Sequence, residues 1–377
     1  MSRPTDHANL NLTDFNREVI FGRAGGKVIW QPRILCWYDD RVFRDGKLTG
    51  KYDGMQPWEL YRSLGCSNRC YDYNGCIEMY YAEPELIHGS SRQISEMETE
   101  YIVETPVGTV TTIQRRNNSN FGVYSAKWWA EDEEDIKVLI WLEEQKRYRW
   151  NQTAWDNAAS HWEGLGLPSI YVNRVNIQTP IVETMGVEGT IYALMDFEDT
   201  MEEYFRVLDE SSMRMIEAIN QSPLEWVNFG DNIHAGITPP NLFEKYILPA
   251  YQRRNEKLHE AGKWSFAHWD GDCHALLPYM NECGLDGIEA ITPKPQGDVT
   301  LEEVRAHIGD TFIVDGIPAI MFDPNYPLED LKSFTRKILE MFGGQLVLGI
   351  SDEMSSTGDI ERVRVVGELV DEYNASL

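Results

Sequence analysis

The side chains best suited to chemistry in this chain lie between residues 264 and 298. His268, Asp270 and Glu289 end or follow two short apolar runs, which are separated by a predicted helix over residues 274–283. A strand with a polar tip followed by a helix is typical of a β/α barrel, whose active site lies on the loops after the strands. Histidine nitrogen and carboxylate oxygen can bind a hard or borderline cation, and both groups can carry protons.

Other predicted strand ends carry polar residues of the same kinds. They are Asn228, Asp231, Asp315, Asp352 and Glu353. All strands of a parallel barrel end at one mouth, so residues about 35 positions apart in sequence can meet at ligand distance. For each single carboxylate the alternative is a structural role, as a cap of the next helix or as the partner of an arginine such as Arg305.

We assign three sets of roles to these residues. His268 and Glu289 are the first choices as metal ligands, because a charged group in an apolar run needs a partner or a function. Asp352 is a further ligand, and Asp270 is a ligand or a general acid. The catalytic set also contains Asn228 and Asp231, the latter as an additional ligand. The substrate-binding candidates are Trp37, Tyr38, Trp269 and Asp315. Aromatic rings can stack on an aromatic substrate or enclose a methylammonium group, although Trp and Tyr are also frequent core residues.

A regular alternation of strands and helices must position these side chains. After Pro168, strands are predicted over residues 169–176, 225–229, 264–268, 287–291, 312–315 and 345–349. Helices are predicted over residues 186–194, 201–219, 240–261, 274–283, 301–307 and 327–342. With one or two strands from the N-terminal third, the pattern predicts an α/β fold, an eight-stranded (β/α)8 TIM barrel.

The first third of the chain has a different texture. A helix is predicted over residues 12–21, a first barrel strand over 33–38, a β-hairpin over 100–115 and mainly helical structure over 131–162. We therefore expect an N-terminal extension over 1–165 and the main body of the barrel over 166–377, in one structural domain.

Composition limits the partners and the location of the protein. The 377 residues carry a formal charge of −27, which disfavours nucleic acids and anionic membranes. No apolar run approaches the roughly 20 residues of a membrane helix, and the first residues lack the pattern of a signal peptide, so a cytoplasmic location is expected. Cys66, Cys70 and Cys76 lie close together, but their spacing is a poor match to zinc or iron–sulfur sites and indicates structural or incidental thiols.

Four sequence segments resemble the uroporphyrinogen decarboxylase superfamily. They are FGDNI, PPNLFEKYILPAYQ, FAHWDGDCHALLPYMNECGLDGIEAITPKPQGD and GISDEMSSTGDIERVRVVGELV. The resemblance covers about residues 169–373. It implies a TIM barrel and leaves the reaction open, because this superfamily contains decarboxylases, corrinoid-linked methyltransferases and other members.

The resemblance is closer to the methyltransferase branch than to the decarboxylase. The decarboxylase binds a tetrapyrrole through two arginines near a Gln-Ala-Gly core, whereas this chain has only Arg33 and Arg41 in that region. Thiol-methylating relatives hold zinc through a His-x-Cys pair and a late cysteine. Here His268 matches the histidine, Asp270 replaces the first cysteine, and Ser351 with Asp352 stands at the late position.

The resemblance therefore implies a zinc site of histidine and carboxylates in a methyltransferase or demethylase. Its substrate would be a small methoxylated or methylated compound, and cobalamin on a separate corrinoid protein would take part in the transfer. A homodimer is a further implication. The alternatives are a metal-dependent lyase, decarboxylase or hydrolase that uses no corrinoid, and a non-catalytic binding protein.

Overall fold

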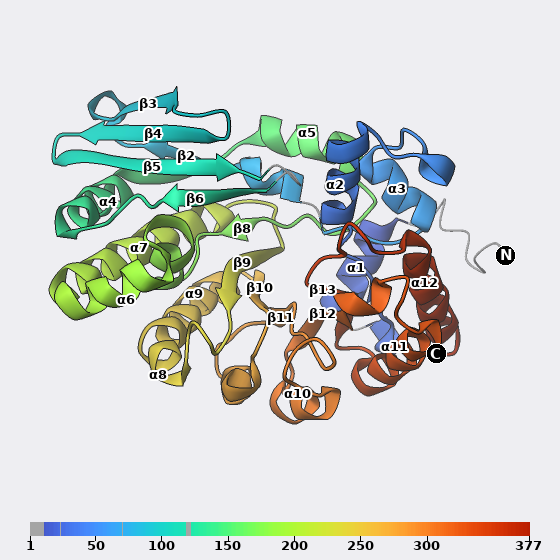
Figure 1. Ribbon diagram of the computed structural model, residues 1–377. Helices are drawn as coiled ribbons and strands as arrows, with labels where there is room; N and C mark the ends of the chain where they lie inside the picture. Colours follow the sequence, from blue (N-terminus) through green and yellow to red (C-terminus); the bar gives the residue numbers. More distant parts are fainter. Residues whose placement is uncertain (1–10, 23, 70, 118–121) are drawn as a thin grey trace.

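A parallel β-sheet forms the centre of the computed structural model, which describes residues 11–22, 24–69, 71–117 and 122–377 (Figure 1). Its seven strands lie in the order β1-β13-β12-β11-β10-β9-β8. Their bounds are β1 Ile29–Trp30, β8 Tyr171–Val172, β9 Trp226–Ile233, β10 Trp264–Trp269, β11 Gly287–Glu289, β12 Phe312–Pro318 and β13 Leu346–Ser351. Every residue of β12 and β13 is buried, as expected for parallel strands that are covered on both faces.

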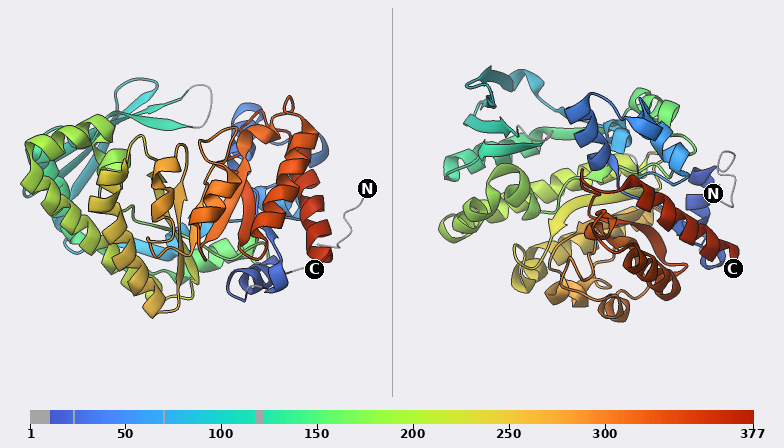
Figure 2. Two further views of the ribbon diagram at one scale, coloured as in Figure 1. Left: turned by 90° about the horizontal axis from the view of Figure 1, so that it is seen from below. Right: turned by 45° about the vertical axis from the view of Figure 1, so that its right-hand side comes forward.

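Helices alternate with these strands and surround the sheet (Figure 2). They are α6 Gly186–Asp196, α7 Glu198–Asn220, α8 Pro240–Leu242, α9 Leu248–Glu260, α10 Leu301–His307, α11 Leu328–Phe342 and α12 Ile360–Ala375. The α10 helix illustrates the local signals, because Thr300 and Glu303 form a reciprocal capping box at its start. This parallel α/β architecture is that of the predicted TIM barrel.

An extended segment bridges the two outer strands of the sheet. The backbone N–H of Ser67 donates to the Trp30 carbonyl at the end of β1 (2.9 Å), and the N–H of Asn68 donates to the Leu165 carbonyl (2.8 Å) in the chain that leads to β8. Seven named strands and this segment therefore surround the barrel interior. The pairing of β1 with β13, Ile29 with Val347 and Trp30 with Leu348, joins the N-terminal part to the barrel body. The single structural domain and its boundary near residue 165 stay predictions.

The N-terminal part also forms two smaller sheets outside the barrel. One pairs β2 Ile77–Tyr81 with β7 Lys146–Trp150. The other contains β3 His88–Gln93, β4 Glu98–Thr105, β5 Gly108–Arg116 and β6 Val123–Lys127. This four-stranded sheet lies over α4 Glu133–Gln145, α6 and α7, away from the barrel strands (Figure 1). The β4–β5 pair confirms the predicted hairpin.

The early helices include α1 Leu12–Ile20, which confirms the helix predicted over residues 12–21. The prediction of a strand over residues 33–38 is wrong. The first barrel strand is β1, and α2 Leu35–Asp45 follows it. Short apolar runs do not distinguish a strand from a helix. Here burial of one helical face decides, and Gly46 at a φ of 78° ends the helix. The remaining helices of this part are α3 Pro57–Leu64 and α5 Gln152–Trp162.

Three further predicted elements differ from the structure. Residues 274–283 contain a short 3₁₀ helix, His274–Tyr279, because Pro278 lacks the N–H that an α-helix needs. The region 131–162 is interrupted by β7, and the strand predicted over 169–176 is only two residues long. No helix among the described residues is long and apolar enough to cross a membrane. Cys66 and Cys76 are buried, whereas Cys70 lies outside the described residues.

Candidate active site

The register of two neighbouring strands brings His268 and Glu289 together. They are directly paired positions at the ends of β10 and β11. His268 Nδ1 lies 2.9 Å from Glu289 Oε2, and the Glu289 side chain is fully buried. A carboxylate on Nδ1 fixes the orientation of an imidazole ring and makes Nε2 the nitrogen that is free to bind something else.

A buried arginine holds the Glu289 carboxylate in place. Arg69 lies 2.8 Å from Glu289 Oε1 and 2.6 Å from Asp315 Oδ1, so one guanidinium joins the ends of β11 and β12. Burial alone would raise the pKa of Glu289, but Arg69, Arg33 and His268 outweigh it and hold that pKa well below its ordinary value. Glu289 is therefore ionised at neutral pH.

Asp315 has the opposite electrostatic balance. Burial raises its pKa to about 7, although Arg69 and Arg33 act against the rise. Its backbone φ is 83°, a left-handed conformation that non-glycine residues rarely adopt. Such a conformation persists where surrounding contacts enforce it, and here the Arg69 contact holds the carboxylate toward the barrel interior.

A second arginine joins the N-terminal part of the chain to the mouth. Arg33 Nη1 lies 2.5 Å from Asp352 Oδ1, just after β13, and its Nε donates to Glu353 at 3.1 Å. The same Nη1 is 3.4 Å from His268 Nδ1. Burial raises the pKa of Glu353, with Arg33 opposing the rise. Arg33 thus links the segment after β1 to the segment after β13.

Three side chains at the mouth converge in a way that suits a metal ion. The ring nitrogen Nε2 of His268 lies 3.7 Å from Asp270 Oδ1 and 3.6 Å from Asp352 Oδ1. One ligand atom from each of the three residues lies within 4.8 Å of the others. Asp270 Oδ1 is buried and has no hydrogen-bond partner among the described residues. No cysteine belongs to this group in the part of the chain that the structure describes.

Asn228 and two tyrosines complete the inner wall. Asn228, fully buried in β9, donates from Nδ2 to Glu289 Oε2 at 3.0 Å. The Tyr71 hydroxyl lies 3.3 Å from Glu289 Oε1 and 3.2 Å from the same Asn228 amide. The Tyr71 ring stacks on Tyr171 with centroids 4.0 Å apart. Asn228 thus contacts the carboxylate that orients His268.

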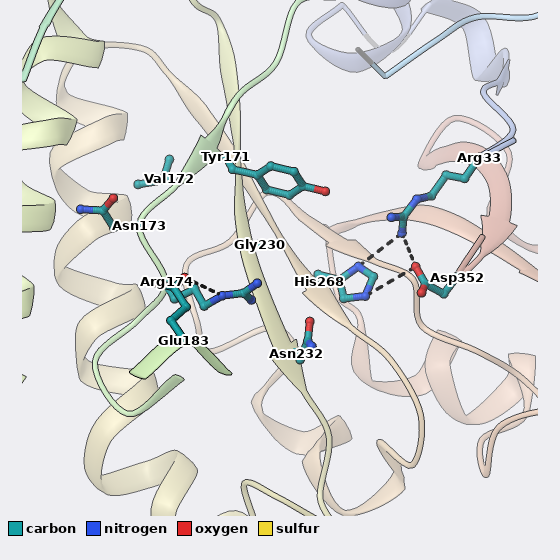
Figure 3. A pocket seen from close by; sticks show the side chains of 10 residues that line it. All are labelled: Arg33, Tyr171, Val172, Asn173, Arg174, Glu183, Gly230, Asn232, His268 and Asp352. Carbon is teal, nitrogen blue, oxygen red and sulfur yellow. Dashed lines mark hydrogen bonds and ion pairs between the residues drawn. The ribbon is translucent and has the colours of Figure 1, made fainter. Parts of the chain in front are cut away.

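A cavity of about 520 Å³ lies in front of His268 (Figure 3). It is lined by Arg33, Tyr171, Val172, Asn173, Arg174, Glu183, Gly230, Asn232, His268 and Asp352. Arg33, His268 and Asp352 lie on one side, and Arg174 lies across from them beside Glu183 and Asn232 (Figure 3). A volume of this size is typical of a small-molecule site.

Asp231 lies apart from the convergent group, although it belongs to the same strand as Asn228. Its side chain is fully buried and accepts hydrogen bonds from the Tyr251 hydroxyl (2.7 Å) and the backbone N–H of Val175 (2.9 Å). Burial raises the pKa of Asp231, and Tyr251 opposes the rise. These contacts are of the kind expected for a structural carboxylate, and Asp231 is not part of the group of His268, Asp270 and Asp352.

The three aromatic candidates for substrate binding do not line the cavity. Trp37 is buried and donates to the Gly358 carbonyl at 2.9 Å, and the Tyr38 hydroxyl donates to the Met55 carbonyl at 3.0 Å. Trp269 is fully buried and packs against Phe243. Aromatic side chains provide much of the apolar area of a core, and these three do so here.

Several residues of the site were not named as site residues from the sequence, among them Arg33, Arg69, Tyr171 and Arg174. Arg33 and Arg69 come from the N-terminal part of the chain, Tyr171 lies in β8, and Arg174 follows that strand. A lone arginine in an uncharged run, as in SLGCSNRC, is the one signal that could have indicated Arg69. The burial of Arg69 depends on contacts over more than 200 residues of sequence, which no local pattern shows.

Comparison with known proteins agrees with this architecture. The family model Uroporphyrinogen decarboxylase (URO-D) matches residues 180–373. A methyltransferase from Methanosarcina mazei is similar in structure, with a TM-score of 0.51 and 13% identity over 69% of this chain and 75% of that chain. At this identity the likeness shows the fold alone.

A putative vitamin-B12 independent methionine synthase from Listeria monocytogenes aligns more loosely. Its TM-score is 0.42 at 13% identity, over 92% of this chain and 96% of that chain, and it carries no argument here. No curated protein matches the sequence. The matched residues span more than half of the chain and include β9 to β13 with the His268, Glu289 and Asp352 positions. The chain therefore belongs to the uroporphyrinogen decarboxylase family.

Proposed function

We propose that this protein is a metal-dependent methyltransferase that removes a methyl group from a small methoxylated or methylated compound. The observation that carries the proposal is the convergence of His268 Nε2 with the Asp270 and Asp352 carboxylates beside a cavity of small-molecule size. The structural likeness to a methyltransferase supports the fold on which such a site would be built.

The residues present fit a zinc ion. One imidazole nitrogen and two carboxylate oxygens form a donor set that zinc accepts, with a further position left for substrate. The buried Asp270 Oδ1 without a hydrogen-bond partner also favours a cation, since an unpaired buried acceptor is costly. In this proposal Glu289 orients His268 from the other side of the ring, whereas the sequence indicated it as a direct ligand.

Zinc held by these side chains would act as a Lewis acid that accepts the negative charge developing on the oxygen or nitrogen of the methyl donor. Glu289 keeps His268 Nδ1 engaged, so that Nε2 is directed to Asp270 and Asp352. Arg33 holds one Asp352 oxygen and restricts its rotation. Asp270 is one-third exposed and can alternatively donate a proton to the leaving group.

We propose cobalamin on a separate corrinoid protein as the methyl acceptor. Such a cofactor would supply both electrons of the new bond to the methyl carbon, and the donor's oxygen or nitrogen would keep the electron pair of the broken bond and gain a proton. The Asp352 side chain is 45% exposed, so the metal group can be approached from solvent on that side. The family resemblance supports this acceptor, as it supports a partner protein.

A lyase, decarboxylase or hydrolase without corrinoid is the second candidate. Arg33 favours it, because a guanidinium beside His268 and Asp352 is well placed to bind a carboxylate of a substrate. Such an enzyme would need the same metal group and no methyl acceptor.

Metal analysis with matched variants tests the proposal. We expect about one zinc per chain in the wild type, and loss of zinc in His268→Ala and Asp270→Asn. Asp231→Asn is the control, since it changes a buried strand carboxylate outside the group and should keep its metal. Methyl transfer to added cob(I)alamin from methoxyaromatics and methylamines should follow the metal content. Zinc without transfer from any donor would favour the second candidate.

A further inference from the structure

The side of the cavity opposite His268 contains an arginine with unused hydrogen-bond donors. Arg174 Nε donates to Glu183 Oε1 at 2.9 Å. Its Nη1 is buried and has no hydrogen-bond partner among the described residues. Its Nη2 forms no hydrogen bond to another described residue either. A buried guanidinium nitrogen without an acceptor is costly, so an acceptor supplied by a ligand would be favourable.

The backbone around Arg174 is held firmly. Its carbonyl accepts from Arg254 Nη1 at 3.2 Å and from the Thr179 hydroxyl at 3.5 Å. Arg254 is itself fully buried and pairs with Asp209. A guanidinium on such a fixed segment loses little freedom on binding, which favours geometric recognition of a planar anion.

A flat wall of the same cavity limits what can lie between Arg174 and His268. A Cβ atom at Gly230 would lie 2.5 Å from Cδ1 of Tyr171, so the ring lies directly over the glycine backbone. Tyr171 also stacks on Tyr71. The close approach at position 230 and the stacking together fix the Tyr171 ring as a rigid surface of the cavity.

We propose that Arg174 is a specificity-determining residue that binds a carboxylate of the methyl donor. The donor is then a small acid with its carboxylate at Arg174 and its methyl-bearing atom toward His268, on opposite sides of the cavity (Figure 3). Glu183 occupies Nε, and Nη2 has no partner among the described residues, so Nη2 remains to donate to the carboxylate. The identity of the ligand as a methyl donor rests on the proposed function. Binding of its carboxylate by Arg174 does not depend on methyl transfer.

The net charge of the chain makes this local arrangement informative. A chain with a formal charge of −27 repels anions in general. The cavity nevertheless contains Arg33 and Arg174, balanced by Glu183 and Asp352. A carboxylate can therefore enter a cavity without net charge and gain directed hydrogen bonds there.

Calorimetric titration of the zinc-loaded protein tests the proposal. The probes are 2-, 3- and 4-methoxybenzoate and methoxyacetate, each compared with its neutral amide. At least one acid should bind roughly 10- to 100-fold more tightly than its amide, the range expected for hydrogen bonds to a charged group. Arg174→Gln should remove this preference. Arg206→Gln, which removes an exposed arginine from α7, should leave it unchanged.

Glu183→Gln separates recognition from a structural role. It removes the negative charge beside Arg174 while the amide oxygen can still accept from Nε, so the preference for the acid should persist or increase. If the ion pair only supports the loop, Glu183→Gln and Arg174→Gln will weaken acids and amides alike. That result, or an equal affinity of every acid and its amide in the wild type, overturns the proposal.

The same protein separates this inference from the proposed function. Acid binding that depends on Arg174, without methyl transfer from any donor, would retain the carboxylate site and reject the methyltransferase. Methyl transfer from neutral donors without any preference for acids would retain the methyltransferase and reject the role of Arg174.

Discussion

Glu289 and Asp231 are two fully buried carboxylates at the same end of the barrel, yet their surroundings make them opposites. Glu289 contacts Arg69, His268 and Asn228, and its pKa is far below its ordinary value although burial acts to raise it. Asp231 contacts a tyrosine hydroxyl and a backbone N–H, and burial raises its pKa.

The difference shows that a polar residue in an apolar strand does not by itself indicate chemistry. A buried charge needs compensation, and the type of compensation decides what the group can do. Two arginines keep Glu289 ionised, which makes it an orienting partner for an imidazole ring. Asp231 is hydrogen-bonded to neutral donors, and the charges of Arg174 and Arg254 do not overcome its burial, which suits a structural link between β9 and its neighbours.

Removing the cation of the Glu289 region should have the largest effect. Arg69→Met leaves the Glu289 and Asp315 carboxylates buried without their shared guanidinium. We expect the free energy of unfolding, measured with urea, to fall by about 3–5 kcal/mol. Arg62→Met, at an exposed arginine of α3, is the control and should change it by about 0.5 kcal/mol or less. A loss below about 1 kcal/mol for Arg69→Met would show that the arginine is not needed to compensate these carboxylates.

The second-largest effect should be a pH dependence of the unfolding free energy that arises from the titration of Asp315. With a pKa raised to about 7, folded Asp315 keeps a proton that the unfolded chain releases near pH 4. Its contribution to stability is therefore present at low pH and is lost as the pH rises to about 7, by up to about 1.4 kcal/mol per pH unit. Glu289, whose pKa is lowered, contributes in the opposite sense and loses stability as the pH falls below its ordinary pKa.

Asp315→Asn isolates this titration. The unfolding free energy of the wild type minus that of the variant should decrease between pH 5 and pH 7 and become constant above pH 8. Unfolding in urea at each pH gives the difference directly. A difference that does not change with pH would show that Asp315 is ionised throughout this range.

The smallest expected effects on stability come from replacing the tyrosines that contact Asp231 and Glu289. Tyr251→Phe removes the 2.7 Å donor of Asp231 and should lower the unfolding free energy by about 1–2 kcal/mol. Tyr71→Phe removes a 3.3 Å contact to Glu289, which keeps its arginine and amide partners, so about 0.5–1 kcal/mol is expected. Thermal unfolding of both variants measures the contrast. A larger loss for Tyr71→Phe than for Tyr251→Phe would show that Glu289 depends on its tyrosine hydroxyl more than Asp231 does, contrary to this prediction.

Much of the barrel could be predicted from sequence because its signals are local. The runs around 264–268, 287–291, 312–315 and 345–349 became β10 to β13, and capping and proline signals located α10 and α11 between them. The errors lie where local patterns are ambiguous. Residues 33–38 form part of a helix, since tertiary burial decides the conformation of a short apolar run.

The candidate site was predictable only in part. His268, Asp270 and Asp352 were named from strand ends, and the structure brings them together. Trp37, Tyr38 and Trp269 were named from residue type alone, and they are buried away from the cavity. Residue type states what a side chain can do, whereas its position depends on contacts with distant parts of the chain.

The sequence alone determined the alternation of strands and helices, the polar strand ends and the family, because these depend on periodicity and on motifs within short segments. Only the tertiary structure decided that Glu289 contacts His268, that Asp231 is hydrogen-bonded to Tyr251 and Val175, and that Arg33, Arg69 and Arg174 lie at the mouth. The physical reason is that burial and charge compensation set the chemistry of an ionisable group, and both depend on contacts between residues that can lie more than 300 positions apart.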